Sequence, residues 1–356
     1  QREDFQTSIV PGETLNLEIE LATASRGGAY AAISGVQHGY RQIDSVRKSG
    51  SCNVDTSCGA ADPWSDAVRA SARITVAGTS LCSAVLLNNT AQNGDPLMLT
   101  ADHCGLTFDN ANRTVVYWNY ETTPCSGSPN GSLRQNQSGA ELLARNANPD
   151  FALLRLDDLP AESFNVYYAG WDSTGGTFSR GVSVHHPRGH EKRISFFERT
   201  PRKVRALVDG DPVQSWEVFW NDGVTEPGSS GSGLFDQNQR VVGQLSGGNS
   251  SCENPDGSDV YGRVDFAWSA EGGDQASLAP WLDPNRTGER SIDGLDGSDP
   301  AVSARRDEYT VGQRVSTIPL DVLQNDFGLR PLQILSATAS SGRPSRSSPS
   351  RLQLKW

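Results

Sequence analysis

The strongest constraint on the fold of this chain is a succession of short apolar segments separated by turn residues. Such spacing is typical of an all-β protein, and we count about six segments on each side of a glycine-rich break at residues 173–176. We therefore predict two six-stranded antiparallel β-barrels packed around a crevice, with a short terminal helix over residues 277–283. The expected strands cover residues 73–77, 82–87, 97–101, 114–120, 141–144, 151–156, 166–169, 182–185, 194–198, 215–220, 234–235, 240–245 and 261–268.

The charge and hydrophobicity of the chain argue against several classes of binding partner. The formal net charge of −11 argues against a nucleic-acid or anionic-membrane partner. No apolar run is long enough to span a membrane. The chain begins at Gln1 without a signal-peptide pattern, which we interpret as a fragment or a precursor whose targeting segment is missing.

The cysteines indicate the redox compartment. An even number in a turn-rich chain predicts disulfides and an oxidising environment, although the sequence alone leaves every pairing open. A zinc site built on His103, Cys104 and Cys82 is the alternative, but adjacent His and Cys ligands are awkward and no C-x₂-C spacing is present. We expect neither a metal nor a cofactor. The six cysteines are Cys52, Cys58, Cys82, Cys104, Cys125 and Cys252.

The stretch Gly223-Val-Thr-Glu-Pro-Gly-Ser-Ser-Gly-Ser-Gly233 contains the candidate nucleophile, Ser230. A serine hydroxyl needs a base, and the oxyanion that it forms needs preorganised donors. The backbone N–H groups of Gly228 and Ser230 are the candidates for that oxyanion hole. A flexible Ser/Gly loop is the alternative, but the stretch runs directly into a predicted hairpin, which a linker has no reason to do.

Two further residues complete a candidate catalytic triad. His103 ends the apolar run Pro96-Leu-Met-Leu-Thr-Ala-Asp-His103 and is the candidate base, while Asp150 stands at the mouth of an apolar strand and is its candidate partner. Asp102 is a poor partner because neighbouring strand residues point to opposite faces. The same argument favours a structural role for the pair His185-His186 over metal ligation or a rival base. The order His, Asp, Ser is that of chymotrypsin-like proteases.

Several motifs resemble the bacterial lysyl endopeptidase branch of the chymotrypsin-like serine proteases, over residues 49 to about 296. Six of them occur in the family's order, which chance does not explain. They are Ser49-Gly-Ser-Cys-Asn53, Leu99-Thr-Ala-Asp-His-Cys-Gly105, Val115-Val-Tyr-Trp-Asn-Tyr120, Tyr168-Ala-Gly-Trp-Asp172, His185-His-Pro187 with Glu191-Lys-Arg-Ile-Ser195, and Gly223-Val-Thr-Glu-Pro-Gly-Ser-Ser-Gly-Ser232.

The resemblance implies pairings and roles that spacing alone does not give. It implies disulfides Cys52–Cys252, Cys58–Cys125 and Cys82–Cys104, and it places the acid that recognises a substrate lysine at Asp259. Capping of a surface turn is the alternative role for Asp259. The sequence departs from some family members at Ser246, where a histidine near the triad can occur.

Residue composition divides the chain into three parts. Residues 1–48 contain no cysteine and end at Arg47-Lys48, so we interpret them as the tail of a propeptide that is cleaved between Lys48 and Ser49. An amino-terminal β extension that stays attached is the alternative. Residues 49–296 are the predicted protease domain. Residues 297–356 read as a linker and a truncated cadherin-like or immunoglobulin-like module that we expect to be partly disordered.

The combined prediction is a secreted serine endopeptidase that cleaves after lysine through a Ser-His-Asp triad and an acyl-enzyme. We expect a monomer that acts on protein and peptide substrates. A trypsin-like protease of broader Lys/Arg specificity is one alternative. A catalytically silent surface adhesion protein with a protease fold is the other, although it leaves the order of His103, Asp150 and Ser230 as a coincidence.

Overall fold

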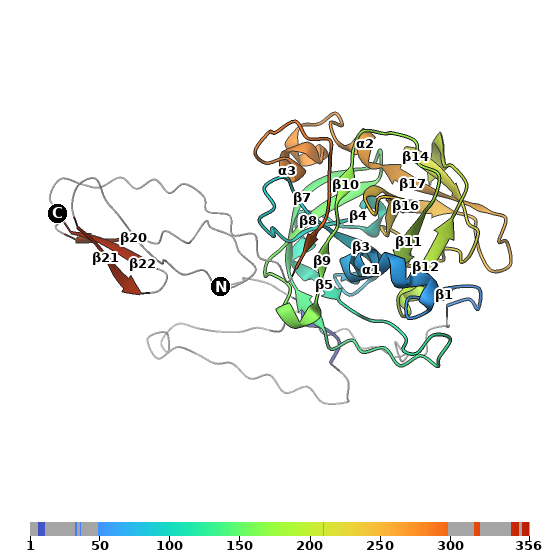
Figure 1. The fold of residues 1–356 in the computed structure, drawn as a ribbon, viewed down its shortest axis with the longest axis horizontal. Coiled ribbons are helices and arrows are strands. Elements are labelled where there is room, and N and C mark those ends of the chain that lie inside the picture. Colours follow the sequence, from blue (N-terminus) through green and yellow to red (C-terminus); the bar gives the residue numbers. More distant parts are fainter. Residues whose placement is uncertain are drawn as a thin grey trace.

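The computed structural model describes residues 6–10, 33, 36, 49–208 and 210–297, together with three strands nearer the carboxyl terminus. The described part is mostly β, as predicted, and its larger elements form two sheets (Figure 1). Lys48 and most of the predicted propeptide lie outside the described residues. No helix in the described part is long and apolar enough to cross a membrane.

The first sheet has seven strands in the order β6-β5-β2-β3-β4-β8-β7. Its two end strands follow one another in the chain and are separated only by Gly139. The Gly139 N–H donates to Thr114 O (2.8 Å), and its carbonyl accepts from Asp157 N (3.2 Å). The sheet therefore curls until its ends meet. Its strands are β2 (Ser71–Val76), β3 (Ser80–Leu87), β4 (Leu97–Ala101), β5 (Thr114–Tyr117), β6 (Asn136–Ser138), β7 (Ala140–Asn146) and β8 (Phe151–Leu156).

The second sheet has ten strands, eight of them in the order β1-β12-β11-β15-β16-β17-β14-β13. Beside them, β10 pairs with β16 and β18. Beyond the end of β14, Asp222 pairs with Phe196 of β12, so this sheet also curves back on itself. Its strands are β1 (Val54–Asp55), β10 (Trp171–Asp172), β11 (Gly181–His185), β12 (Arg193–Phe197), β13 (Arg202–Val208), β14 (Asp211–Phe219), β15 (Gly233–Asp236), β16 (Val241–Gly248), β17 (Ser258–Arg263) and β18 (Ser291–Ile292).

Three apolar clusters explain why the strands are apolar on both faces. In β4, Met98 packs inside the first sheet, whereas Leu97 and Leu99 belong to a cluster that also contains Val184 and Phe235 of the second sheet. Alternate side chains of a strand point to opposite faces, so one strand serves two cores. A third cluster fills the second sheet. The shared cluster holds the two sheets together.

The structure corrects the sequence prediction in several places. The predicted strand over residues 261–268 is wrong in its second half, because β17 ends at Arg263 and α2 (Val264–Ala267) follows. Val264 and Ala267 are buried while Phe266 is exposed, which is helical spacing. Strand counts of seven and ten differ from the predicted six because of added edge strands such as β13. The helix α1 (Ser65–Ala70) was not predicted, whereas α3 (Ala279–Leu282) lies within the predicted terminal helix.

Two small sheets complete the description. β9 (Tyr167–Tyr168) pairs with β19 (Leu295–Asp296). β20 (Thr317–Leu320), β22 (Arg351–Lys355) and β21 (Arg343–Ser348) form a three-stranded sheet in that order. β21 lies in the Ser/Arg/Pro-rich stretch of residues 340–350, where no strand was predicted.

Candidate active site

His103 lies just beyond the end of β4, in a short 3-10 helix, Asp102–Cys104. The disulfide Cys82–Cys104 ties this helix to β3. The imidazole keeps 29% of its side-chain surface exposed, so a substrate can reach it. Asp102 turns away from it and accepts two hydrogen bonds from Arg145, at 2.6 and 3.0 Å. Asp102 is therefore not the partner of the imidazole. The predicted reason was wrong, however, because Asp102 and His103 lie in a 3-10 helix and not on a strand.

Asp150 is the residue that contacts His103. Its Oδ2 lies 2.9 Å from His103 Nδ1, and its Oδ1 accepts from the His103 backbone N–H at 3.0 Å. The carboxylate is 5% exposed. A buried carboxylate at Nδ1 selects the tautomer with its proton on that nitrogen, which leaves Nε2 as the basic nitrogen of the ring. His103 and Asp150 are thus arranged as a general base and its orienting acid.

The second sheet fixes the backbone of Asp150. The Gln244 side chain donates from Nε2 to the carbonyls of Pro149 (2.9 Å) and Asp150 (3.1 Å). At Gly262 a Cβ would lie 1.9 Å from the Pro149 carbonyl, so only glycine permits this approach. Asp150 therefore lies where the two sheets meet. Gln244 could not be identified from the sequence, because no motif spacing marks a side chain that binds backbone across an interface.

Ser230 lies in the loop between β14 and β15, which is held against the strands that lead to His103. Its carbonyl accepts from Ser83 N of β3 at 2.8 Å. At the next residue, Gly231, a Cβ would lie 2.1 Å from Thr100 Oγ1 and 2.8 Å from Ala101 N, both on β4. The structure thus brings the half-buried Ser230 to the end of β4 that carries the imidazole.

The backbone around Ser230 presents two unused donors. Ser229 N donates to Glu226 O (2.9 Å) and Gly231 N donates to Leu245 O (2.8 Å). Among the described residues, the N–H groups of Gly228 and Ser230 have no protein acceptor. Gly228 has φ +96°, and a Cβ there would lie 2.9 Å from Gly189 N. Two free N–H groups beside a serine are what an oxyanion hole requires.

Asp259 is a fully buried carboxylate, 1% exposed, held by neutral donors. Its Oδ2 accepts from Trp220 Nε1 (2.6 Å), Thr225 Oγ1 (2.7 Å) and Ser250 Oγ (2.6 Å). Among the described residues, its Oδ1 accepts from Ser250 N alone, at 3.2 Å. No lysine, arginine or histidine in the described part of the chain forms an ion pair with it. A buried anion without a cation can receive the ammonium group of a ligand.

The other acids near Ser230 in sequence have different surroundings. Asp256 is exposed, and Asp265 pairs with Arg263 and, at 3.8 Å, with Lys203. Glu226 accepts from Arg188 Nε at 2.7 Å. Each of these carboxylates is therefore solvated or already neutralised. The sequence did not point to Trp220, Thr225 and Ser250, because they come from separate segments that meet only in the fold.

Three disulfides join Cys52 with Cys252, Cys58 with Cys125, and Cys82 with Cys104. These are the pairs that the resemblance implies. The first ties the segment after Lys48 to the loop that precedes Asp259, and the third closes the loop that carries His103. Within the described residues no cysteine is free.

Replacing Cys82 and Cys104 together by serine should lower the free energy of unfolding by roughly 3 kcal/mol, since the disulfide closes a loop of 22 residues. Urea denaturation followed by tryptophan fluorescence measures this loss. We expect His103 to become less well positioned and kcat/KM to fall as well. Replacing Cys58 and Cys125 is the matched control, because it should cost stability without moving His103. Equal activity in both double variants would contradict this account.

Comparison with known proteins gives four matches of interest. The family described as "Lysyl endopeptidase, C-terminal domain" matches residues 46–262. A lysyl endopeptidase of Pseudomonas aeruginosa is 32% identical in an alignment 276 residues long, which covers 70% of this chain and 58% of that protein's length. The Rv3671c protease from M. tuberculosis in its active form is 16% identical over 67% of this chain and 92% of that one, with a TM-score of 0.41. The HtrA-type protease AlgW with a tripeptide is 19% identical over 57% and 59%, with a TM-score of 0.40.

Proposed function

The chain belongs to the lysyl endopeptidase family, and from this premise we propose that it is a serine endopeptidase that cleaves peptide bonds on the carboxyl side of lysine. The observation that carries the proposal is the pair His103–Asp150, placed beside a loop that holds Ser230 and two unused N–H groups. The buried Asp259, which has no cation partner in the described part of the chain, supports the choice of lysine.

The proposed reaction follows from these positions. The Ser230 hydroxyl gives its proton to His103 Nε2 and attacks the carbonyl carbon of the substrate lysine, while Asp150 stabilises the imidazolium. The N–H groups of Gly228 and Ser230 bind the oxyanion of the tetrahedral intermediate. His103 then protonates the leaving amine, and water repeats the sequence on the acyl-enzyme. The ammonium group of the lysine pairs with Asp259.

The proposed architecture is that of two chymotrypsin-like barrels within a protease domain of residues 49–296. Support comes from the continuity of β6 and β7 at Gly139 and from the pairing of Phe196 with Asp222, which bring the ends of each curled sheet together. Three disulfides favour an extracytoplasmic location, and we propose that the protein is secreted. Residues 297–356 remain a proposed linker and partial β module.

A direct assay tests the proposed function. The purified chain should hydrolyse a lysyl ester, and a serine-directed acylating inhibitor should abolish that hydrolysis. Comparison with the arginyl ester separates lysine specificity from the broader trypsin-like alternative. A chain that hydrolyses neither ester and does not react with the inhibitor would be the silent adhesion protein instead.

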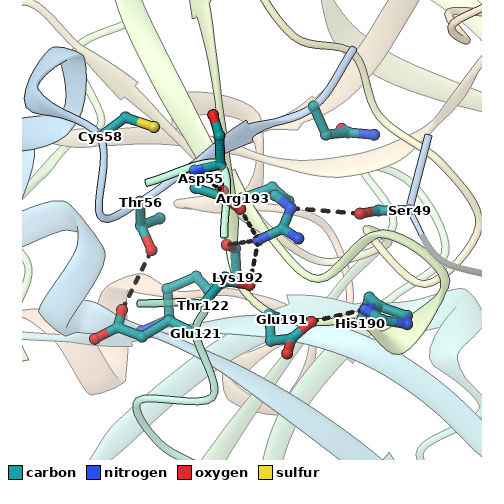
Figure 2. A network of polar contacts seen from close by, with 12 residues as sticks. Ser49, Asp55, Thr56, Cys58, Glu121, Thr122, His190, Glu191, Lys192 and Arg193 are labelled. Atoms are coloured by element: carbon teal, nitrogen blue, oxygen red, sulfur yellow. Dashed lines mark hydrogen bonds and ion pairs between the residues drawn. The ribbon is translucent and has the colours of Figure 1, made fainter. Parts of the chain in front are cut away.

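Removal of residues 1–48 should proceed by the enzyme's own cleavage after Lys48. The segment that follows this bond is firmly held: Ser49 Oγ accepts from Arg193 Nε at 3.3 Å, as Figure 2 shows, and Gly50 N donates to Glu226 at 2.8 Å. Arg193 also pairs with Asp55. Cleavage therefore removes residues 1–48 without releasing the new amino terminus from its contacts. Amino-terminal sequencing of the mature protein should begin at Ser49.

Two variants of the precursor decide this point. Ser230→Ala should stay uncut, and Lys48→Gln, whose catalytic residues are unchanged, should also stay uncut at this bond. Active preparations that begin at residue 1, or a Ser230→Ala precursor that matures equally well without any other protease, would contradict the prediction.

A further inference from the structure

His185 is a buried histidine whose two nitrogens both contact serines. It is the last residue of β11 and has no exposed surface. Its Nδ1 lies 2.7 Å from Ser229 Oγ, and its Nε2 lies 3.1 Å from Ser195 Oγ. Ser229 directly precedes Ser230. The imidazole therefore contacts the candidate catalytic loop at Ser229, and the proposed reaction does not use it as a base.

The hydrogen bonds fix where each proton lies. The Ser195 hydroxyl donates to the Val224 carbonyl at 2.8 Å, so its oxygen accepts from His185 Nε2–H. Burial lowers the pKa of His185 to about 3, and the nearby positive charge of Arg193 lowers it as well. The ring is therefore neutral near pH 7 and has one N–H. Its Nδ1 then accepts, and the Ser229 hydroxyl donates to it.

This chain of hydrogen bonds reaches both ends of one loop. Residues 224–230, which we call the oxyanion loop, begin at Val224, whose carbonyl is the last acceptor of the chain. Near the other end, Ser229 Oγ accepts from Glu226 N at 3.2 Å and donates to the imidazole. Gly228 and Ser230, which supply the two unused N–H groups, lie on either side of Ser229. Any shift of Ser229 moves both donors.

We propose that His185 is a positioning residue of the active site, a neutral imidazole that holds Ser229 so that the N–H groups of Gly228 and Ser230 point at the oxyanion. The inference rests on the proposed function. If His185 and Ser229 only filled space in the core, their replacement would lower stability but not kcat. As positioning residues, they should affect kcat. Ser229 carries no charge, so the loop is held at this point without an ion pair to a free amino terminus.

The substitution Ser229→Ala tests this role with little change in volume. It leaves His185 Nδ1 without a donor and the Glu226 N–H without its hydroxyl acceptor. We expect kcat for a lysyl ester to fall roughly 10- to 100-fold while KM changes by less than about twofold, because donors to the oxyanion act in the transition state. A lysyl peptide aldehyde, whose hemiacetal oxygen occupies the oxyanion position, should bind more weakly by about the same factor.

A matched control separates positioning from stability. Ser71→Ala removes an equally buried hydroxyl, which donates to Ala67 O at 2.9 Å in the first sheet. It should lose a similar amount of stability and keep kcat and aldehyde affinity unchanged. In addition, His185→Ala should lose kcat as Ser229→Ala does, and added imidazole should restore part of it. If His185→Ala does not fold, Ser229→Ala decides alone.

Two outcomes would overturn the inference. Only the second of them would also overturn the proposed function. If the unaltered chain hydrolyses the lysyl ester and Ser229→Ala matches it in kcat and aldehyde affinity, the positioning role is wrong and the proposed function stands. If the unaltered chain neither hydrolyses the ester nor reacts with a serine-directed acylating reagent, the proposed function and this inference both fail.

Discussion

Ser230→Ala should fold with its three disulfides and lose turnover of lysyl substrates by roughly 10⁴- to 10⁶-fold. Within the described hydrogen bonds Ser230 contributes only its carbonyl, which accepts from Ser83 N. Removal of the hydroxyl should therefore cost less than about 0.5 kcal/mol in unfolding free energy. Single-turnover kinetics with a lysyl ester, together with a thermal unfolding curve, measure both quantities.

His103→Ala provides the companion test. Because triad members act as a unit, it should cost about as much as Ser230→Ala, and the double variant should lose little more. Ser71→Ala again serves as the control for loss of a buried hydroxyl. Substantial turnover in pure Ser230→Ala, free of contaminating protease, would mean that the nucleophile is another residue.

Asp259→Asn should lower kcat/KM for lysyl substrates by roughly 30-fold to several-thousand-fold, which is the cost of leaving a desolvated ammonium without its partner. The side-chain amide can still accept at one oxygen from Trp220, Thr225 and Ser250, so the fold should persist. The amide nitrogen, however, replaces the oxygen that accepts from Ser250 N. Some loss of stability should therefore accompany the loss of charge.

A small uncharged acylating reagent gives the internal check. Its reaction does not require the proposed contact between a substrate lysine and Asp259. It should therefore label Ser230 in Asp259→Asn at close to the normal rate. Asp256→Asn is the matched control, because it makes the same change three residues earlier on an exposed side chain. If Asp259→Asn cleaves lysyl bonds at close to the original rate, the pocket acid lies elsewhere, and Glu226 should be replaced next.

The sequence predicted strands best where both faces are buried. Residues 97–101 and 151–156 were predicted with the bounds that β4 and β8 have, because each is an apolar run with turn residues before it. The prediction went wrong at residues 261–268, where apolar residues interrupted by Arg263 and Asp265 continue through a change from strand to helix. The strand β13 was missed because four of its seven residues are exposed, the other three are only partly buried, and its charges hide the alternation.

The residues of the candidate site could likewise be predicted only where a local motif marks them. His103, Asp150 and Ser230 could be proposed because local motifs surround them, and the structure places the first two in contact. The contacts of Trp220 and Thr225 with Asp259 and of Gln244 with Asp150 could not, since they join segments far apart in the chain. His185 was assigned a structural role, and only the partners of its two nitrogens connect it to the oxyanion loop.

The most direct test of lysine-specific endopeptidase activity is mass spectrometry of the peptides that the purified chain releases from a denatured protein rich in both lysine and arginine. We expect nearly every new carboxyl terminus to be lysine and no peptides from Ser230→Ala. Frequent carboxyl-terminal arginine would contradict the assigned specificity, and an absence of cleavage by the mature, acylation-competent chain would contradict the assigned activity.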